Sequence, residues 1–299
     1  MSFLDKLHNG TPTLSFEFFP PKNPDGWSTL YQTLGNIARR NPDYVTVTYG
    51  AGGSTRRKTV DLVSRIQDEL GIEAMAHLTC VGHSRDELTE ILSSLQAAGI
   101  KYIMALRGDP PKGQTKFVAH ECGFAYASDL IAFIKDHFDF HLGCSFYPET
   151  HPEAESPERD IEVLRLKQDS GADFAVSQIF FDNDTFYRFR DKAARMGVTL
   201  PLVAGILPVT SLAQLAPDGI CQRSGTGVPQ SLLDFLGTGD DIVDRGVQYA
   251  HRQCRDLLEH GVPGIHFYTL NRSPSSLRVT EALRADGYFP VPKLAAASR

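Results

Sequence analysis

Residues 13–26 read TLSFEFFPPKNPDG, and this stretch decides between the two fold classes that suit the chain. Its first six residues are mostly apolar, as in a buried strand, and Pro20 and Pro21 prevent that strand from continuing. A doubly wound sheet that binds a dinucleotide would place a glycine-rich GxGxxG turn after its first strand. No such turn follows this stretch, so the sequence favours a (β/α)8 barrel.

The rest of the chain alternates short apolar runs with amphipathic segments, and eight strands are predicted from it. They lie at 13–18, 43–48, 73–78, 101–106, 140–146, 173–179, 200–206 and 263–267. Helices are predicted between them, among others at 57–70, 85–98, 158–170 and 241–260. We therefore expect a single α/β domain over 1–299, a (β/α)8 TIM barrel. Two predicted loops, 107–125 and 216–230, are longer than their connections require.

Composition limits the kinds of partner. The chain has 30 Lys plus Arg and 36 Asp plus Glu, whereas a protein that binds nucleic acid as its main role needs a basic excess. No apolar run approaches the roughly 18 residues of a membrane span. The five cysteines are widely spaced and form no CxxC pair, which argues against a disulfide framework or zinc knuckle. We expect a cytoplasmic protein that binds neither nucleic acid nor membrane.

Polar residues gather where the predicted strands end, which in a barrel is the face that carries active sites. Each of these polar residues could also have a purely structural role. Glu17 could be a structural ion-pair partner of an arginine, and His77 and His266 could be core histidines bonded to backbone carbonyls. A metal site is disfavoured, because barrel metallohydrolases usually carry an HxH pair on one strand and none occurs here. Asp160 and Lys167 are seven residues apart and should share one helix face. The carboxylate would suit ribose hydroxyls and the ammonium a phosphate, or both could belong to a solvated, salt-bridged helix surface.

Ten ordered blocks resemble one enzyme family. They are SFEFFPP (15–21), VTVTYGAGGS (45–54), HLTC (77–80), ALRGDPP (105–111), YASDL (126–130), YPETHPEA (147–154), D-x6-K (160–167), SQIFFD (177–182), GILPV (205–209) and HFYTLNR (266–272). Together they span nearly the whole chain and resemble the methylenetetrahydrofolate reductases of the short bacterial type.

The resemblance implies a fold and a reaction. The family is a (β/α)8 flavoprotein that binds FAD without a covalent link. NADH or NADPH reduces the flavin, and 5,10-methylenetetrahydrofolate then takes the hydride and becomes 5-methyltetrahydrofolate in a ping-pong mechanism. The resemblance further implies a homo-oligomer with small-molecule substrates and, for a chain of this length, neither a regulatory domain nor inhibition by S-adenosylmethionine.

Residue roles follow from the same motifs. Glu17 matches the general acid, and Asp109 matches a catalytic carboxylate near the flavin and the folate. We expect Phe16, Phe18 and Phe19 to surround the Glu17 carboxyl and so favour its protonated form. Both carboxylates are implied to contact substrate, as are Gln178, Gln214 and Arg272. The implied flavin-binding positions are Thr48, Tyr49, Ala51, His77, Arg107, Gly108, Asp109, Ala127, Tyr147, His151, Ala154, Asp160 and Lys167.

Three positions depart from the pattern associated with the family. Val163 and Leu166 stand where a polar and a basic residue are common, and Asp218 stands where a phenylalanine would stack on substrate. Two alternatives therefore remain. One is a different flavin barrel with a changed second substrate, and the other is a folate- or nucleotide-binding protein without catalysis.

Overall fold

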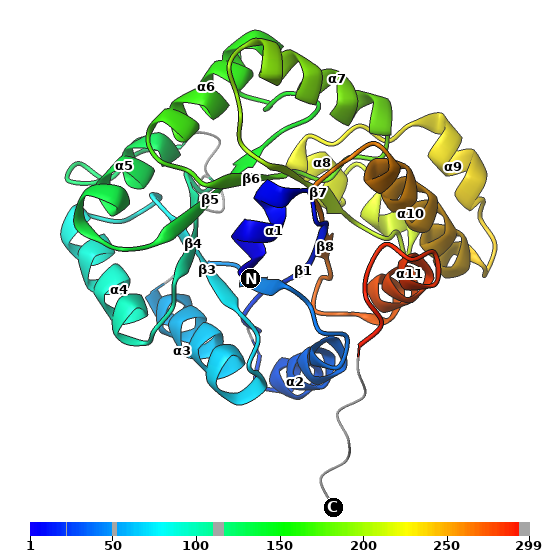
Figure 1. The fold of residues 1–299 in the computed structure, drawn as a ribbon, viewed down its shortest axis with the longest axis horizontal. Coiled ribbons are helices and arrows are strands. Elements are labelled where there is room, and N and C mark those ends of the chain that lie inside the picture. Colours follow the sequence, from blue (N-terminus) through cyan, green and yellow to red (C-terminus); the bar gives the residue numbers. More distant parts are fainter. Residues whose placement is uncertain (22, 50–52, 110–116, 293–299) are drawn as a thin grey trace, which may run out of the picture.

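The computed structural model describes residues 1–21, 23–49, 53–109 and 117–292, and its centre is a closed barrel of parallel strands (Figure 1). The strands follow one another around the barrel in chain order, and β1 pairs with both β2 and β8 to close it. They are β1 (Thr13–Phe18), β2 (Tyr44–Val47), β3 (Ala74–Thr79), β4 (Tyr102–Leu106), β5 (His141–Phe146), β6 (Phe174–Ser177), β7 (Leu202–Ile206) and β8 (Gly264–Tyr268).

A ring of helices surrounds the strands and buries their outward apolar side chains (Figure 1). The ring contains α2 (Asp25–Ala38), α3 (Gly53–Leu70), α4 (Arg85–Ala97), α5 (Ala127–His137), α6 (Pro157–Asp169), α7 (Asn183–Arg195), α10 (Ile242–Glu259) and α11 (Pro274–Ala285). Between β7 and α10 lie the 3-10 turn η1 (Leu212–Gln214) and two short helices, α8 (Ile220–Ser224) and α9 (Gln230–Leu236).

The predicted fold class is confirmed, and the ends of all eight predicted strands lie within two residues of prediction. Strand β6 is shorter than predicted, since it ends at Ser177 and not at 179. The segment 216–230 is not the plain loop that we expected, because it contains α8. The described part of 107–125 has neither helix nor strand.

Helix α1 (Phe3–Asn9) lies across the end of the barrel where the strands begin, and Figure 1 shows it inside the ring of strands. Phe3, Leu4 and Leu7 are buried there in a cluster with Tyr44, Met75, Tyr102, Met104, Phe174, Val176 and Val203. This end of the barrel is therefore filled by apolar side chains, and the polar residues of the interior lie toward the opposite end.

The side chains of strand β1 alternate between the inside of the barrel and the surrounding helices. Successive residues of a strand point to opposite faces. Phe16 and Phe18 accordingly pack in the core between the strands and helices, with Leu30, Leu34 and Ile37 of α2, while Ser15 and Glu17 point into the barrel. The expectation that these two phenylalanines surround the Glu17 carboxyl is therefore wrong. Phe19, beyond the strand, is 40% exposed.

Within the described ranges, no helix combines the length and the apolar character that a membrane crossing needs.

Candidate active site

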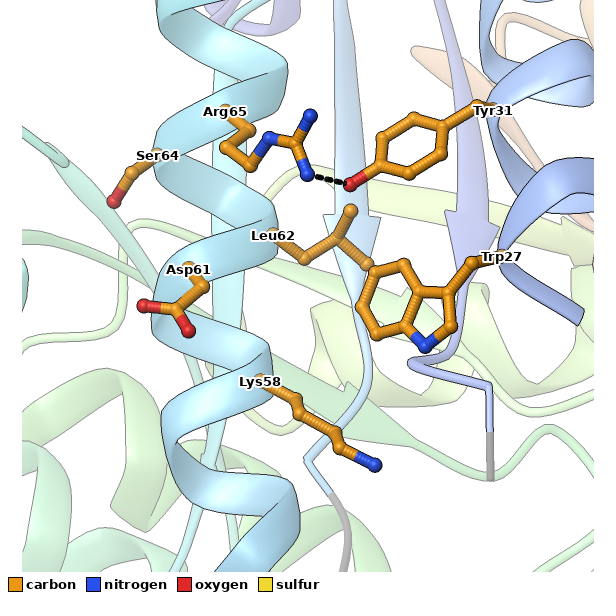
Figure 2. Close-up of a pocket in the computed structure, with 7 residues that line it drawn as sticks. All are labelled: Trp27, Tyr31, Lys58, Asp61, Leu62, Ser64 and Arg65. Carbon is orange, nitrogen blue, oxygen red and sulfur yellow. Dashed lines mark hydrogen bonds between the residues drawn. The ribbon is translucent and has the colours of Figure 1, made fainter. Parts of the chain in front are cut away.

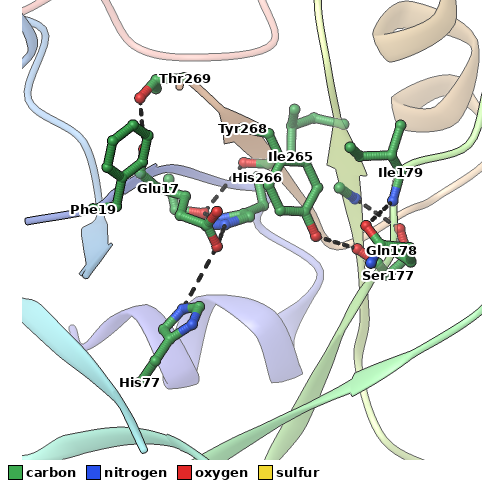
Figure 3. A network of polar contacts seen from close by, with 12 residues as sticks. Glu17, Phe19, His77, Ser177, Gln178, Ile179, Ile265, His266, Tyr268 and Thr269 are labelled. Carbon is green, nitrogen blue, oxygen red and sulfur yellow. Dashed lines mark hydrogen bonds and ion pairs between the residues drawn. The ribbon is translucent and has the colours of Figure 1, made fainter. Parts of the chain in front are cut away.

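The Glu17 carboxylate lies between two imidazoles inside the barrel, near the end where the strands finish (Figure 3). Its Oε2 is 3.6 Å from His77 Nε2 on β3 and 3.9 Å from His266 Nε2 on β8. The side chain is 19% exposed, so the carboxyl remains accessible from the barrel mouth. Among the described side chains, no lysine or arginine forms an ion pair with it, which removes the structural ion-pair explanation for that part of the chain.

The two histidines are held differently. His77 Nε2 has no hydrogen-bond partner among the residues that the structure describes, and burial lowers the pKa of this imidazole to about 4, although the nearby Glu17 charge acts in the opposite direction. His77 is therefore neutral near pH 7. His266 is fully buried, and its Nδ1 is 2.8 Å from Ser15 Oγ. The serine fixes the ring so that its other nitrogen faces Glu17.

The Tyr268 side chain lies beside Glu17 and His266 (Figure 3). Its ring meets His266 edge to face, with centroids 5.4 Å apart, and its hydroxyl donates to Ser177 O at 2.7 Å. Burial raises the pKa of this phenol well above its usual range, so it is a hydrogen-bond donor and not a base. The ring crosses Gly205 of β7, where a Cβ would lie 2.6 Å from Tyr268 Cε2. A side chain at 205 would remove this arrangement.

The segment after β8 fixes the end of β1. Thr269 Oγ1 donates to Glu17 O at 2.6 Å. The Asn271 amide accepts from Phe19 N at 2.9 Å and donates to Phe19 O at 2.7 Å. Leu270 and Asn271 both have positive φ, at 50° and 59°, which turns the chain sharply enough to make these bonds. The motif HFYTLNR thus fixes the backbone at the Glu17 carbonyl and at Phe19, two residues further along the chain.

A second polar group lies after β4 and β5. Arg107 forms a fork with Glu153, with Nη1–Oε2 and Nη2–Oε1 distances of 2.5 and 3.0 Å, and its guanidinium lies 5.0 Å from the centre of the Phe117 ring. Gly108 follows with φ of 89°, and a Cβ there would lie 2.6 Å from Val81 Cγ1, so glycine is required. Asp109 is exposed beyond it.

Helix α6 completes the second group. Asp160 Oδ2 accepts from His151 N at 2.8 Å, and Lys167 Nζ donates to Ser145 O at 2.7 Å. Both side chains therefore face β5 and the turn that follows it, as their spacing predicts, and they do not form a solvated salt bridge. Burial raises the pKa of Asp160 and lowers that of His151, the latter with help from the nearby Arg107 charge.

The other predicted residues are less closely grouped. The Tyr147 ring meets His151 edge to face at 4.6 Å, and Tyr49 contacts His83 at 5.5 Å between ring centroids. Gln214 Oε1 accepts from Thr210 N at 2.7 Å and so helps cap η1, while Arg272 is exposed. The remaining positions lie at or near the ends of elements: Thr48 after β2, Ala127 at the start of α5, Ala154 after β5 and Gln178 directly after β6. Ala51 lies outside the described residues.

Sequence reasoning gave no role to four residues that the structure places in these groups. Ser15 and Asn271 lie inside the motifs given above. Their partners, His266 for Ser15 and Phe19 for Asn271, become visible only when β1 pairs with β8. Tyr268 lies in the motif HFYTLNR without a role of its own, and His266 of the same motif was considered only as a core histidine. In the described ranges, no three His, Cys, Asp or Glu residues are grouped as a metal site would require.

Two cavities lie outside the barrel and contain none of the predicted site residues. One, of about 590 Å³, is formed by Trp27 and Tyr31 of α2 facing Lys58, Leu62 and Arg65 of α3 (Figure 2). The other, of about 600 Å³, lies beside α7, α9 and α10 and is lined in part by Phe235, Tyr249 and Arg252. Neither adjoins Glu17.

Comparison with known proteins places this geometry in a family. The chain is 36% identical to 5,10-methylenetetrahydrofolate reductase of Escherichia coli K12, over 92% of this chain and 91% of that protein. It is 35% identical to methylenetetrahydrofolate reductase (NADH) 1 of Arabidopsis thaliana, over 93% of this chain but 50% of the plant protein. The chain thus spans about half the length of the plant relatives that it matches.

A solved structure and a family profile complete the comparison. The structure is that of an uncharacterized Clostridium thermocellum protein that binds two copies of 5-methyl-5,6,7,8-tetrahydrofolic acid. It aligns with a TM-score of 0.65 at 17% identity, over 95% of this chain and 98% of that one, which supports the fold alone. The profile of methylenetetrahydrofolate reductase matches residues 2–284. This chain therefore belongs to the methylenetetrahydrofolate reductase family.

Proposed function

We propose that this protein reduces 5,10-methylenetetrahydrofolate to 5-methyltetrahydrofolate, with FAD as a non-covalent cofactor and NADH or NADPH as electron donor. The observation that carries the proposal is the Glu17 carboxyl, which is held between His77 and His266 at the mouth of a barrel of this family. A partly exposed carboxyl with no lysine or arginine partner among the described side chains is suited to proton transfer.

The second polar group fits a dinucleotide cofactor. Arg107 offers a guanidinium to phosphate, and Lys167 keeps two ammonium protons beyond the one that it donates to Ser145 O. Asp160 offers a carboxylate of the kind that binds ribose hydroxyls. Bound FAD would supply hydride transfer, while the chain would supply orientation, charge and protons.

The residues around Glu17 support proton donation to the folate. Glu17 would give its proton to a nitrogen of the substrate's five-membered ring, which opens that ring to the electrophilic 5-iminium form. The resulting carboxylate would face His77 and His266, which present nitrogens within 3.9 Å. Thr269 and Asn271 fix the backbone at Glu17 and at Phe19, so the acid does not have to be repositioned during the reaction.

The test is to measure the two half-reactions separately, without oxygen. Purified protein should be yellow, NADH or NADPH should bleach it, and methylenetetrahydrofolate should then restore the colour rapidly. Protein that takes up no FAD would contradict this proposal and would favour a binding protein without catalysis. Bleaching without rapid reoxidation by the folate would favour a changed second substrate.

The changed-substrate alternative is supported by two features of the segment after β7. Asp218 is exposed there, where a stacking phenylalanine would be expected, and the Gln214 carbonyl is engaged in capping its own turn. The rate of reoxidation by methylenetetrahydrofolate separates the two functions directly. The homo-oligomer and the cytoplasmic location remain predictions.

A further inference from the structure

The proposed function uses Arg107 as a phosphate ligand but gives no role to Glu153, with which that arginine is paired. The two outer nitrogens of the guanidinium each contact one oxygen of the Glu153 carboxylate, at 2.5 and 3.0 Å. One face of the guanidinium lies over Phe117. Arg107 is therefore already held and neutralised by residues of its own chain. Since a phosphate binds the same two-nitrogen edge of an arginine, carboxylate and phosphate compete for it.

The backbone around Glu153 is fixed, while its side chain is half exposed. His151 N donates to Asp160, Glu153 N donates to His151 Nδ1 at 3.0 Å, and Ala154 N donates to His151 O at 2.9 Å. Thr150 has φ of 84°, a rare value for a β-branched residue, and is held there by this turn. The Glu153 side chain is 50% exposed, so it can rotate away from Arg107 without any movement of the loop.

We propose that Glu153 is a resident competitor for Arg107, which a diphosphate-containing ligand must displace in order to bind. The identity of that ligand as FAD rests on the proposed function. If the diphosphate instead bound beside the carboxylate, like charges would lie a few ångströms apart and binding would again be weakened. Either arrangement lowers the affinity for anions. The cost of losing the fork is the same for every anion that displaces Glu153, and only a ligand with further contacts has other binding energy to compensate for it.

The proposal predicts tighter anion binding by Glu153→Gln. The dissociation constant for FAD is measured from the recovery of flavin fluorescence when the purified protein is diluted. That for inorganic pyrophosphate is measured by calorimetry on the same full chain after dialysis. In Glu153→Gln both constants should fall about threefold or more, the scale of a partly exposed ion pair. The difference should shrink at 0.5 M salt, where exposed charges are screened.

Two controls identify the cause. Glu158→Gln, on α6, removes the same charge from an exposed pair with Lys192 of α7, and both constants should stay unchanged. In an Arg107→Gln background, Glu153→Gln should no longer tighten binding, because there is no guanidinium left to compete for. Thermal unfolding of each variant confirms that the fold is retained.

Constants that stay equal or rise in Glu153→Gln would overturn the proposal, as would a failure of every variant to bind either ligand. The proposed function fails separately, if the wild-type protein binds no FAD. The pyrophosphate constants then still decide the role of Glu153. FAD binding that is the same in wild type and Glu153→Gln would contradict only the role of Glu153 as a competitor, and not the proposed function.

Discussion

The His77 imidazole is buried 3.6 Å from the Glu17 carboxylate, and this burial makes the stability of the protein depend on pH. Its pKa is about 4 in the folded protein, below the ordinary value of about 6.5 that the unfolded chain regains. Between these values the unfolded state binds more protons. The free energy of unfolding therefore falls as the pH drops from about 6.5 toward 4. Above pH 6.5 the imidazole is neutral in both states, and this loss of stability is absent.

His77→Gln should flatten this dependence. The loss contributed by the wild-type histidine is about 3 kcal/mol at most across the window, and the variant should lack it. Urea unfolding at several pH values measures the slope, with the exposed His8→Gln as the control. Equal slopes in wild type and His77→Gln would show that His77 is not held neutral by the fold.

Ser15→Ala tests the partner of the second imidazole. The change removes the oxygen 2.8 Å from His266 Nδ1 and leaves that buried nitrogen without a partner. Such a loss costs about 1–3 kcal/mol of unfolding free energy. Ser93→Ala, on the exposed face of α4, should cost far less, and denaturant unfolding compares the two. A loss no larger than that control would mean that the contact does not hold the ring.

Glu17 shows how far the sequence could predict the site. Its isolated charge in an apolar strand marked it as unusual, and its motif gave it a role. Its surroundings could not be predicted from adjacent residues, because strand alternation turns Phe16 and Phe18 to the opposite face. The groups that face it come from β3 and β8, and only closure of the barrel brings them together.

At the scale of elements, β7 depends on a glycine. A Cβ at Gly205 would lie 2.3 Å from Ser177 O and 2.6 Å from the Tyr268 ring, so Gly205→Ala should displace that ring from His266. We expect a loss of about 1–3 kcal/mol in unfolding free energy, as for other overpacked cores. Gly35→Ala in α2 meets nothing within 4 Å and should be neutral or slightly stabilising. Thermal unfolding tests both, and a neutral Gly205→Ala would contradict the packing of Tyr268.

The elements that the sequence missed are short. Alternation of apolar runs and amphipathic segments located the strands well, because each strand is buried and bounded by turns. Helix α8 has only five residues, too few for a helical pattern to be recognised, so 216–230 was predicted as a loop. Gln178 was assigned to β6, but its side chain accepts from Ile179 N at 2.8 Å just after the strand ends.

For the whole molecule, α1 closes the end of the barrel opposite the candidate active site. The Phe3 ring lies 4.2 Å from Tyr44 and 4.6 Å from Tyr102, measured between centroids. Phe3→Ala should cost about 3–5 kcal/mol of unfolding free energy by leaving a cavity, while the half-reaction rates of the folded protein persist. Val291→Ala, at an exposed position, is the control for stability. A loss of rate without a loss of stability would contradict this separation of the two ends.

The central claim is that this barrel carries Glu17 as the acid for the folate and not for the nicotinamide. Stopped-flow measurement of both half-reactions in Glu17→Gln tests it most directly. We predict that reduction of the flavin by NADH or NADPH stays within about a factor of three of wild type, whereas reoxidation by methylenetetrahydrofolate slows by about a hundredfold or more. Equal slowing of both half-reactions, or no slowing of reoxidation, would contradict the account.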